Sequence, residues 1–243
     1  MDINNAVVLV TGASSGIGAA TARAASQAGA RVVLVARRED RLRRLAAELG
    51  NAVALPCDVT NRAEIERAVG QAINECGRID VLVNSAGRGL QATIEHLDAD
   101  DLRATFELNV IAPLLLMQAV LPGMRARGSG AIVNVSSGIT WFDLPGSAGY
   151  SASKAALQKL TTIARAELAE ANIAVSLMFP SITRTEFVAS VRGDLTGAQH
   201  MEANSGLTPD TPENVAGAIL ELIRSGAERA DRVPVEAGGT LAS

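Results

Sequence analysis

Short runs of apolar, mostly β-branched residues recur along the chain, and stretches with helical periodicity separate them. Several runs are continuously apolar rather than alternating, which is typical of strands in a parallel sheet that is covered on both faces. The expected strands are Ala6–Val10, Arg31–Val35, Ala52–Leu55, Ile79–Val83, Ala131–Val135, Ala174–Met178 and a weaker Arg232–Val235.

The stretches between these runs carry start signals of helices. Asn61 precedes Glu64 by three residues, as in a capping box, and Thr211 precedes Pro212, which suits a first helical position. The alternation predicts an α/β fold, a Rossmann-like doubly wound parallel sheet of about seven strands with helices on both faces. The expected helices are Gly16–Gly29, Glu39–Leu49, Asn61–Glu75, Asp101–Arg127, Tyr150–Ala171 and Pro212–Arg224.

No linker or change of composition divides the 243 residues, so we expect a single domain over residues 1–243. The one irregular region, about residues 181–209, is polar and contains glycine. A loop of this length is commonly a lid or a substrate-binding segment, and disorder is the alternative.

The composition excludes several classes of protein. With 48% hydrophobic residues the chain is not intrinsically disordered, and no apolar run approaches the ~18 residues of a membrane span. A net charge of −4 gives no reason to expect nucleic acid or an anionic membrane as a partner. The N-terminus lacks the basic segment of a secretion signal, so we expect a cytoplasmic protein. Cys57 and Cys76 are then expected to be free thiols, and we expect no metal site.

A glycine-rich turn, Thr11–Gly18, joins the first expected strand to the first expected helix. Gly12 would let the chain leave the strand tightly, Gly16 would let a pyrophosphate approach the backbone, and Gly18 would let the helix pack closely. The free N–H groups and the positive end of the helix then face the phosphates. The spacing G-x-x-x-G-x-G in this context predicts a dinucleotide site formed by Gly12, Ser14, Ser15, Gly16, Ile17 and Gly18.

Two arginines follow the second expected strand, where an acidic residue would bind the ribose of NAD(H). Ala36 stands near that position, and Arg37 and Arg38 come next. A guanidinium group can hold a 2′-phosphate that a carboxylate would repel, so we expect NADP(H) to be preferred. Arg37 is the first candidate for this contact and Arg38 the second. The alternative is that both are solvated at a helix start, and NAD(H) stays possible.

The single tyrosine and one of the two lysines stand four residues apart, as Tyr150 and Lys154. On a helix this spacing puts both side chains on one face. A tyrosine pKa of about 10 is too high for acid–base work near neutrality, but a nearby cation lowers it. The pair therefore predicts a general acid/base that is assisted by an ammonium group.

At this point the sequence resembles the short-chain dehydrogenase/reductase family in its single-domain form, over nearly the whole chain. The resemblance is carried by the turn Thr11–Gly18 as TGxxxGxG, by Asn84–Gly87 in place of NNAG, by Ser137 thirteen residues before Tyr150, and by Tyr150-x-x-x-Lys154. It implies an NAD(P)-dependent oxidoreductase that interconverts a carbonyl and a secondary alcohol by hydride transfer. It also implies a homodimer or homotetramer with two long helices paired across a two-fold axis.

The resemblance implies a role for each member of a catalytic set. Tyr150 is the expected general acid/base, Ser137 binds the substrate oxygen, and Lys154 binds the nicotinamide ribose and relays a proton. Asn109 resembles the family's helix asparagine that anchors a relay water. Pro113 has no N–H for the Asn109 carbonyl, which leaves that carbonyl free, although a kink for packing is the alternative.

Further cofactor contacts are also implied by the resemblance. Asp58 and Val59 match the family's pair at the adenine, and Pro180–Thr185 resembles its PGxxxT stretch, with Ser181 in place of glycine. The additional expected contacts are Asp58, Val59, Asn84, Ala86, Gly87, Pro180, Thr183 and Thr185.

The substrate is expected to be a small carbonyl or alcohol compound with apolar character. Candidate wall residues are Trp141, Phe142, Leu144, Phe187, Val188 and Met201, although core packing explains them nearly as well. A catalytically weak, regulatory dinucleotide-binding protein and an NAD-preferring alcohol dehydrogenase are the alternatives. A sugar-nucleotide epimerase would need a C-terminal substrate domain, and a serine hydrolase would need a G-x-S-x-G elbow that the chain lacks.

Overall fold

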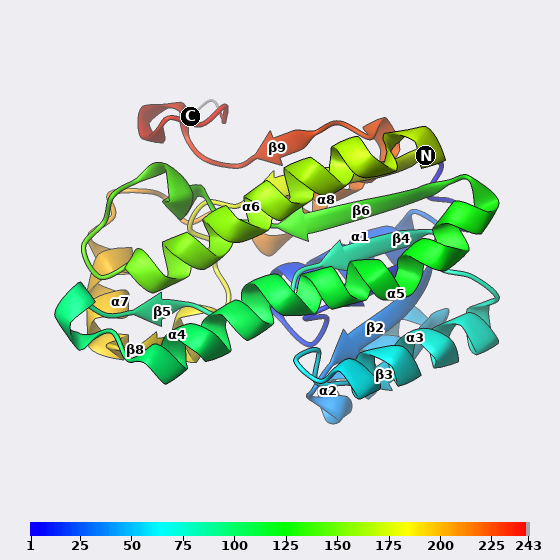
Figure 1. Ribbon diagram of the computed structural model, residues 1–243, viewed down its shortest axis with the longest axis horizontal. Coiled ribbons are helices and arrows are strands. Elements are labelled where there is room, and N and C mark those ends of the chain that lie inside the picture. The colour runs from blue at the N-terminus through cyan, green and yellow to red at the C-terminus, as the bar shows by residue number, and fades with distance from the viewer. Residues whose placement is uncertain (242–243) are drawn as a thin grey trace.

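The computed structural model describes residues 1–241 and is built around one twisted parallel sheet (Figure 1). Within these residues the sheet has seven strands in the order β3-β2-β1-β4-β6-β7-β9, so the predicted Rossmann-like architecture is confirmed. The order reverses between β1 and β4, which opens a crevice at the carboxyl ends of the strands. The strands are β1 Val7–Thr11, β2 Arg31–Ala36, β3 Ala52–Pro56, β4 Val81–Asn84, β6 Gly130–Val135, β7 Ile173–Phe179 and β9 Arg229–Asp231.

Helices cover both faces of the sheet and bury a separate apolar cluster on each side. Figure 1 shows α3, α5 and α6 in front of the sheet, with α1 and α8 behind it. The strands β1, β2, β4, β6 and β7 are buried on both sides, which explains their continuously apolar sequences, whereas the edge strands β3 and β9 are partly exposed. The helices are α1 Gly16–Gln27, α2 Glu39–Leu49, α3 Arg62–Cys76, α4 Ala99–Phe106, α5 Ala112–Arg127, α6 Ala148–Leu168, α7 Leu195–Ala203 and α8 Pro212–Ser225.

The prediction of a strand at Arg232–Val235 is wrong. The last strand is β9, three residues earlier, and it pairs in parallel with β7. The apolar character that suggested the later position has another cause. Val233 is a core residue that is buried beneath the loop that follows β6. Pro234 has no N–H for a ladder, and residues Val235–Ala237 form a short 3₁₀ turn, η6.

The long helix expected over Asp101–Arg127 is divided by one wide turn. A π-helical turn, η2 Glu107–Ile111, separates α4 from α5, and the Ala112 N–H bonds the Glu107 carbonyl five residues back. Pro113 is the second residue of α5, after this turn, and supplies no N–H for a regular helical bond. The irregular turn therefore falls at the position that Asn109 and Pro113 indicated.

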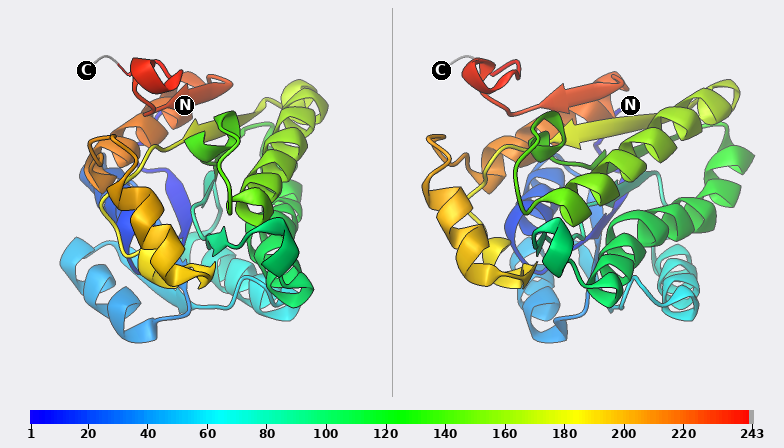
Figure 2. Two further views of the ribbon diagram at one scale, coloured as in Figure 1. Left: turned by 90° about the vertical axis from the view of Figure 1, so that its left-hand side faces the viewer. Right: turned by 60° about the vertical axis from the view of Figure 1, so that its left-hand side comes forward.

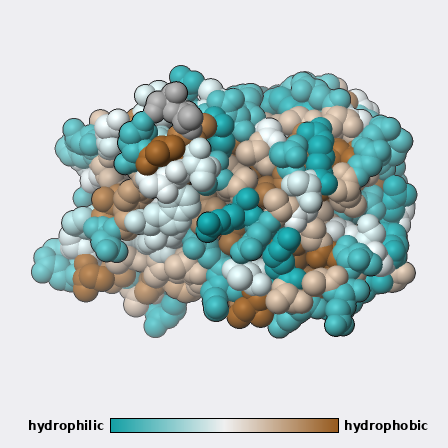
Figure 3. Space-filling view, turned by 90° about the horizontal axis from the view of Figure 1, so that it is seen from above, coloured by the Kyte–Doolittle hydropathy of each residue, from teal (hydrophilic) through white to brown (hydrophobic). Residues whose placement is uncertain are grey.

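The combined helix Ala99–Arg127 is long and apolar enough to cross a membrane by length and composition, contrary to the expectation from apolar runs alone. The same test is passed by core helices of globular folds. Here α5 packs on α3 and on the sheet, and it buries Leu116, Met117 and Val120 there. The face of the molecule over α6 and β9 mixes polar and apolar side chains in separate small groups (Figure 3).

The region expected to be irregular, about residues 181–209, is largely ordered into short elements. It contains a 3₁₀ turn η5 Val188–Ser190, the strand β8 Arg192–Gly193 and the helix α7. β8 pairs in parallel with β5 Leu90–Gln91, and this small sheet stands with α7 at the end toward which the main strands point (Figures 1 and 2). Two distant segments of the chain thus meet beyond the carboxyl edge of the sheet.

Candidate active site

A cavity of about 1200 Å³ lies beyond the carboxyl ends of the strands. It collects eighteen of the twenty residues that the sequence assigned to catalysis or cofactor binding. In the described part of the chain, the other two, Asn84 and Asn109, lie buried behind its wall. The assigned residues that line the cavity are Gly12, Ser14, Ser15, Gly16, Ile17, Gly18, Arg37, Arg38, Asp58, Val59, Ala86, Gly87, Ser137, Tyr150, Lys154, Pro180, Thr183 and Thr185.

The glycine-rich turn has the backbone geometry that its sequence requires. Gly12 and Gly16 adopt φ values of 68° and 52°, which other residues rarely reach. A Cβ on Gly18 would overlap the Gly12 carbonyl oxygen, so this glycine lets the turn close on itself. A Cβ on Gly16 would come within 3.0 Å of the Thr185 methyl group. The turn therefore exposes backbone without side chains where it passes close to Thr185.

Thr11 fixes the turn to the neighbouring strand, a role that sequence reasoning missed. Its hydroxyl oxygen accepts hydrogen bonds from the N–H groups of Ser85 and Ala86, both at 3.1 Å. These residues directly follow β4, so Thr11 joins the ends of two adjacent strands across the crevice. Its position at the end of the first apolar run was the available signal.

The two arginines after β2 lie differently. Arg38 donates hydrogen bonds to the hydroxyl groups of Ser14 at 3.0 Å and Ser15 at 2.6 Å, and it pairs with Glu186 at 2.8 Å. Arg37 is exposed and lines the same cavity. The side chain that the sequence ranked second is thus the one bonded to the turn.

Asp58 follows β3 and marks the far end of the cavity. Burial opposes its ionisation, but hydrogen bonds from the Thr60 N–H and hydroxyl, together with the charges of Arg37 and Arg88, hold its pKa below the ordinary value. Its Oδ1 atom accepts both Thr60 bonds, at 3.0 and 2.8 Å. An ionised carboxylate therefore faces the cavity and can accept a hydrogen bond from an amine.

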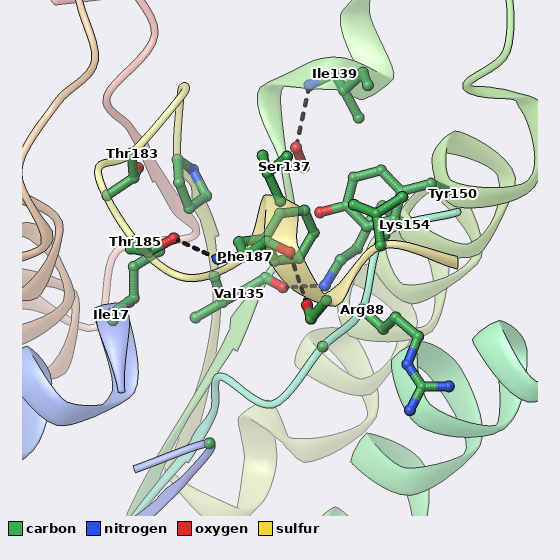
Figure 4. Close-up of a pocket in the computed structure, with 18 of the residues that line it drawn as sticks. Ile17, Arg88, Val135, Ser137, Ile139, Tyr150, Lys154, Thr183, Thr185 and Phe187 are labelled. Carbon is green, nitrogen blue, oxygen red and sulfur yellow. Dashed lines mark hydrogen bonds between the residues drawn. The ribbon is translucent and has the colours of Figure 1, made fainter. Parts of the chain in front are cut away.

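Ser137, Tyr150 and Lys154 converge at the opposite end (Figure 4). Ser137 follows β6 and accepts a bond from the Ile139 N–H, while Tyr150 and Lys154 lie on the first turns of α6. The Lys154 ammonium is buried, donates to the Val135 carbonyl at 2.9 Å, and stands 5.9 Å from the centre of the Tyr150 ring. The predicted helical spacing thus brings the phenol and the amine together.

The pKa of Tyr150 moves in the direction opposite to the one that the sequence suggested. Burial raises the pKa of the phenol to about 12, and the neighbouring Ser137 hydroxyl offsets only part of this rise. Burial also lowers the pKa of Lys154 to about 8. Desolvation is the main cause of both shifts, because it disfavours the charged form of each group, and the Lys154 ammonium donates to a carbonyl group and not to the phenol. At neutral pH the phenol is therefore protonated.

The side chain of Asn109 holds the loop that follows β4. Its Oδ1 accepts from the Arg88 N–H at 3.0 Å, and its Nδ2 donates to the Arg88 carbonyl at 2.9 Å and to the Ser153 hydroxyl at 3.0 Å. Ser153 in turn donates to the Tyr150 carbonyl at 2.7 Å. Asn109 therefore links three parts of the site from behind, through its amide group.

Asn84 lies in a buried chain of polar groups. Its Nδ2 donates to Asn134 at 2.8 Å, and Asn134 donates to the Thr161 hydroxyl at 2.9 Å, which ties β4, β6 and α6 together. Among the described residues, the Asn84 Oδ1 atom is buried and has no hydrogen-bond partner. This chain of hydrogen bonds therefore holds together the two strands and the helix that carry residues of the site.

The segment after β7 closes one side of the cavity. The Pro180 carbonyl accepts from the Gly138 N–H at 2.9 Å. In the described chain only Asn5 and Asn172 have a positive φ among non-glycine residues, so Ser181 fits where the family has glycine. Further along, the Phe187 ring lies 5.6 Å from the Tyr150 ring, which places the segment against the phenol.

Many apolar side chains line the cavity, together with polar ones such as Arg88, Gln91 and Arg192. The ring of Trp141, a candidate wall residue, packs against the ring of Phe179, with the ring centres 5.3 Å apart. Trp141 is not among the residues of the described chain that line the cavity. No group of three or more His, Cys, Asp or Glu within residues 1–241 is placed to hold a metal ion. The larger apolar side chains of the lining include Leu90, Ile139, Phe142, Leu144, Phe187, Val188, Val191, Met201, Leu207 and Val233.

Comparison with known proteins gives consistent matches. The family model of short chain dehydrogenases matches residues 6–196. The chain is 34% identical over 221 residues to an uncharacterized oxidoreductase of Staphylococcus haemolyticus, covering 90% of this chain and 91% of the relative. A short-chain dehydrogenase structure from Streptomyces avermitilis is similar with a TM-score of 0.86 and 34% identity, over 98% of this chain and 91% of the other.

A second solved structure is similar in fold. It is a short-chain dehydrogenase/reductase from Burkholderia phymatum in complex with NAD, with a TM-score of 0.91 and 23% identity. The match covers 98% of this chain and 92% of the other.

Proposed function

Because the chain belongs to the short-chain dehydrogenase/reductase family and is an NAD(P)-dependent dehydrogenase/reductase, we propose that it interconverts a carbonyl and a secondary alcohol with NADP(H) as the preferred coenzyme. The observation that carries this proposal is the meeting of Ser137, Tyr150 and Lys154 at one end of a cavity whose other end is a glycine-rich turn.

The residues present fit a dinucleotide. The bare turn would hold the pyrophosphate with the backbone of Ser14–Gly18, Asp58 and Val59 would contact the adenine, and Lys154 would bind the nicotinamide ribose. Thr185, which lines the same cavity, would contact the carboxamide of the nicotinamide. When bound, the nicotinamide ring supplies or accepts the hydride.

The side chains of the site supply the proton chemistry. In the reducing direction the protonated Tyr150 donates its phenolic proton to the substrate oxygen, and the Ser137 hydroxyl donates a hydrogen bond to the same oxygen. The Lys154 ammonium, whose pKa is about 8, holds a proton that can be passed toward the phenol at neutral pH. In the oxidising direction the phenol first gives its proton to the deprotonated Lys154 amine, and the phenolate oxygen then accepts the proton of the alcohol.

The preference for NADP(H) is supported by charge. Ala36 offers no carboxylate to a ribose, while Arg37 and Arg38 line the cavity, and Arg41 lines a second pocket that also borders the turn. The Burkholderia phymatum protein was solved with NAD, and an NAD preference here is the competing possibility. The arginines favour NADP(H), because a guanidinium group pairs with a phosphate.

Residues 181–209 serve as the lid over the substrate in this proposal. β8 is bonded to β5, and Arg192 pairs with Asp101 of α4, so the segment is held across the cavity mouth. The apolar lining beneath it favours a substrate with apolar character. The lid, the sheet and the helices would work as one catalytic unit.

Assembly as a homodimer or homotetramer is part of the same proposal. Ile111 beside α5 and Ile163 on α6 are large apolar side chains that stay 37% and 45% exposed, on the helices expected to pair. Light scattering would measure the mass in solution, and a monomer would contradict this part.

The experiment that tests the function is NADPH and NADH oxidation with a panel of ketones graded in size and polarity. We expect turnover with apolar ketones and a higher kcat/KM for NADPH than for NADH. Dinucleotide binding with no turnover across the panel would instead favour a regulatory role.

A further inference from the structure

A lid carboxylate is paired with the arginines beside the glycine-rich turn. Glu186 accepts from Arg38 Nη1 at 2.8 Å through Oε2, and Arg41 Nη1 donates to both of its oxygens at 2.8 Å. Arg38 also donates to Ser14 and Ser15. A single acidic group therefore bridges two cations, one of which is fixed to the expected phosphate-binding turn.

Glu186 sits in the part of the lid that contacts the rest of the site. Thr185, before it, lies against Gly16 of the turn, and Phe187, after it, lies against the ring of Tyr150. Glu186 itself lines the same cavity as Arg38. Three consecutive residues thus touch the turn, the arginines and the phenol.

A carboxylate and a phosphate compete for guanidinium groups because both accept parallel N–H···O bonds from the same planar donors. Arg38 already serves Ser14, Ser15 and Glu186 with its side-chain donors. A 2′-phosphate that approached the same guanidinium would meet the negative charge of Glu186 as well as the positive charge of the arginine. Either the Glu186 carboxylate leaves the guanidinium group when the phosphate binds, or both anions bind to it less favourably.

We propose that Glu186 is a coenzyme-specificity residue that competes with the 2′-phosphate of NADP(H) for Arg38 and Arg41. The inference rests on the proposed function, because it takes Arg38 as part of the 2′-phosphate site. Glu186 then weakens the binding of nucleotides that carry a 2′-phosphate and leaves the binding of nucleotides without this group unchanged. When the phosphate binds, Glu186 separates from Arg38 and Arg41, and the lid loses its ion pairs with these arginines.

The size of the effect follows from the exposure of the groups. The side chains of Arg38 and Glu186 are 41% and 54% exposed, and exposed ion pairs of this kind are weak and screened by salt. Removing the competing charge is therefore expected to tighten 2′-phosphate binding by about two- to fivefold. The gain should shrink as the salt concentration rises.

The test is calorimetric titration of the full chain with adenosine 2′,5′-bisphosphate and, separately, with adenosine 5′-monophosphate. The variants are Glu186→Gln and the matched control Glu48→Gln, which also loses a carboxylate paired with an exposed arginine, Arg23, at 2.7 Å. We expect Glu186→Gln alone to lower the Kd of the bisphosphate, by about two- to fivefold, with the monophosphate unchanged. An unchanged Kd for the bisphosphate, a higher one, or an equal change for both nucleotides would overturn the inference.

The same titrations separate this inference from the coenzyme preference. If wild-type protein binds the bisphosphate no more tightly than the monophosphate, and Arg38→Ala changes neither, the proposed NADP(H) preference is wrong. The Glu186→Gln difference still decides the competition by its own sign. Thermal unfolding of both glutamine variants checks that a change in binding is not a loss of folded protein.

Discussion

The buried ammonium group of Lys154 donates a hydrogen bond to the carbonyl oxygen of Val135 at 2.9 Å. This bond ties the first turns of α6 to the end of β6, two residues before Ser137. It also aims the ammonium at a neutral carbonyl, so that desolvation is uncompensated by a carboxylate and lowers the pKa of the amine. The acid–base behaviour of the site follows from this arrangement.

The pH dependence should differ in sign between the two directions of reaction. In the proposed mechanism the Lys154 ammonium resupplies the proton of Tyr150, and this amine is protonated below pH about 8 and deprotonated above it. We therefore expect kcat/KM for carbonyl reduction to fall, and that for alcohol oxidation to rise, as the pH increases through about 8. Stopped-flow rates between pH 6 and 10 would check this, and parallel profiles in both directions would refute it.

Replacing Tyr150 with phenylalanine should remove the proton donor while keeping the ring that packs on Phe187. We expect turnover to fall by about 10²- to 10⁴-fold, with coenzyme affinity within a few fold of wild type. Steady-state kinetics and fluorescence titration with NADPH measure the two quantities. Full turnover in this variant would mean that another group is the acid.

Arg38→Ala should reduce the preference for NADPH more than Arg37→Ala does, because Arg38 is the side chain bonded to the turn. Loss of a charge-assisted hydrogen bond predicts a rise in the KM for NADPH of about tenfold or more, with a smaller effect on NADH. Arg43→Ala is the control, since Arg43 is exposed on α2 and pairs with Glu39 of its own helix. A larger effect in Arg37→Ala would restore the ranking suggested by the sequence.

Asn109→Ala should destabilise the protein, because it leaves the Arg88 N–H and carbonyl without their side-chain partner. Each buried polar group left unpaired costs about 1–3 kcal/mol. Urea unfolding should show a loss of this order, and kcat should fall as well, because the loop that flanks Lys154 is released. An unchanged free energy of unfolding would show that water replaces the amide.

Two glycine-to-alanine changes should act in opposite directions. In Gly18→Ala the new methyl group would overlap the Gly12 carbonyl, so we expect a loss of about 1–3 kcal/mol and weak dinucleotide binding. Gly70→Ala, on α3, meets no atom within 4 Å in the described structure and should stabilise the helix by about 0.5–1 kcal/mol. Thermal unfolding of both variants measures the contrast.

The sequence by itself determined the features that depend on local periodicity. Continuously apolar runs mark strands buried on both faces, glycine spacing marks the turn, and four residues between Tyr150 and Lys154 put both on one face of a helix. These features need no knowledge of distant contacts. They were sufficient to predict the Rossmann-like sheet and the family of the chain, and both predictions are confirmed.

Only the tertiary structure decided what depends on burial and on contacts between distant segments. The position of β9, the packing of Trp141 on Phe179, and the burial of Asn84 and Asn109 behind the cavity depend on neighbours far away in the chain. The pKa of Tyr150 rises because desolvation is a property of the folded environment, which residue spacing does not encode. The hydrogen bonds of Arg38 to Ser14, Ser15 and Glu186 likewise exist only because the fold brings these distant residues together.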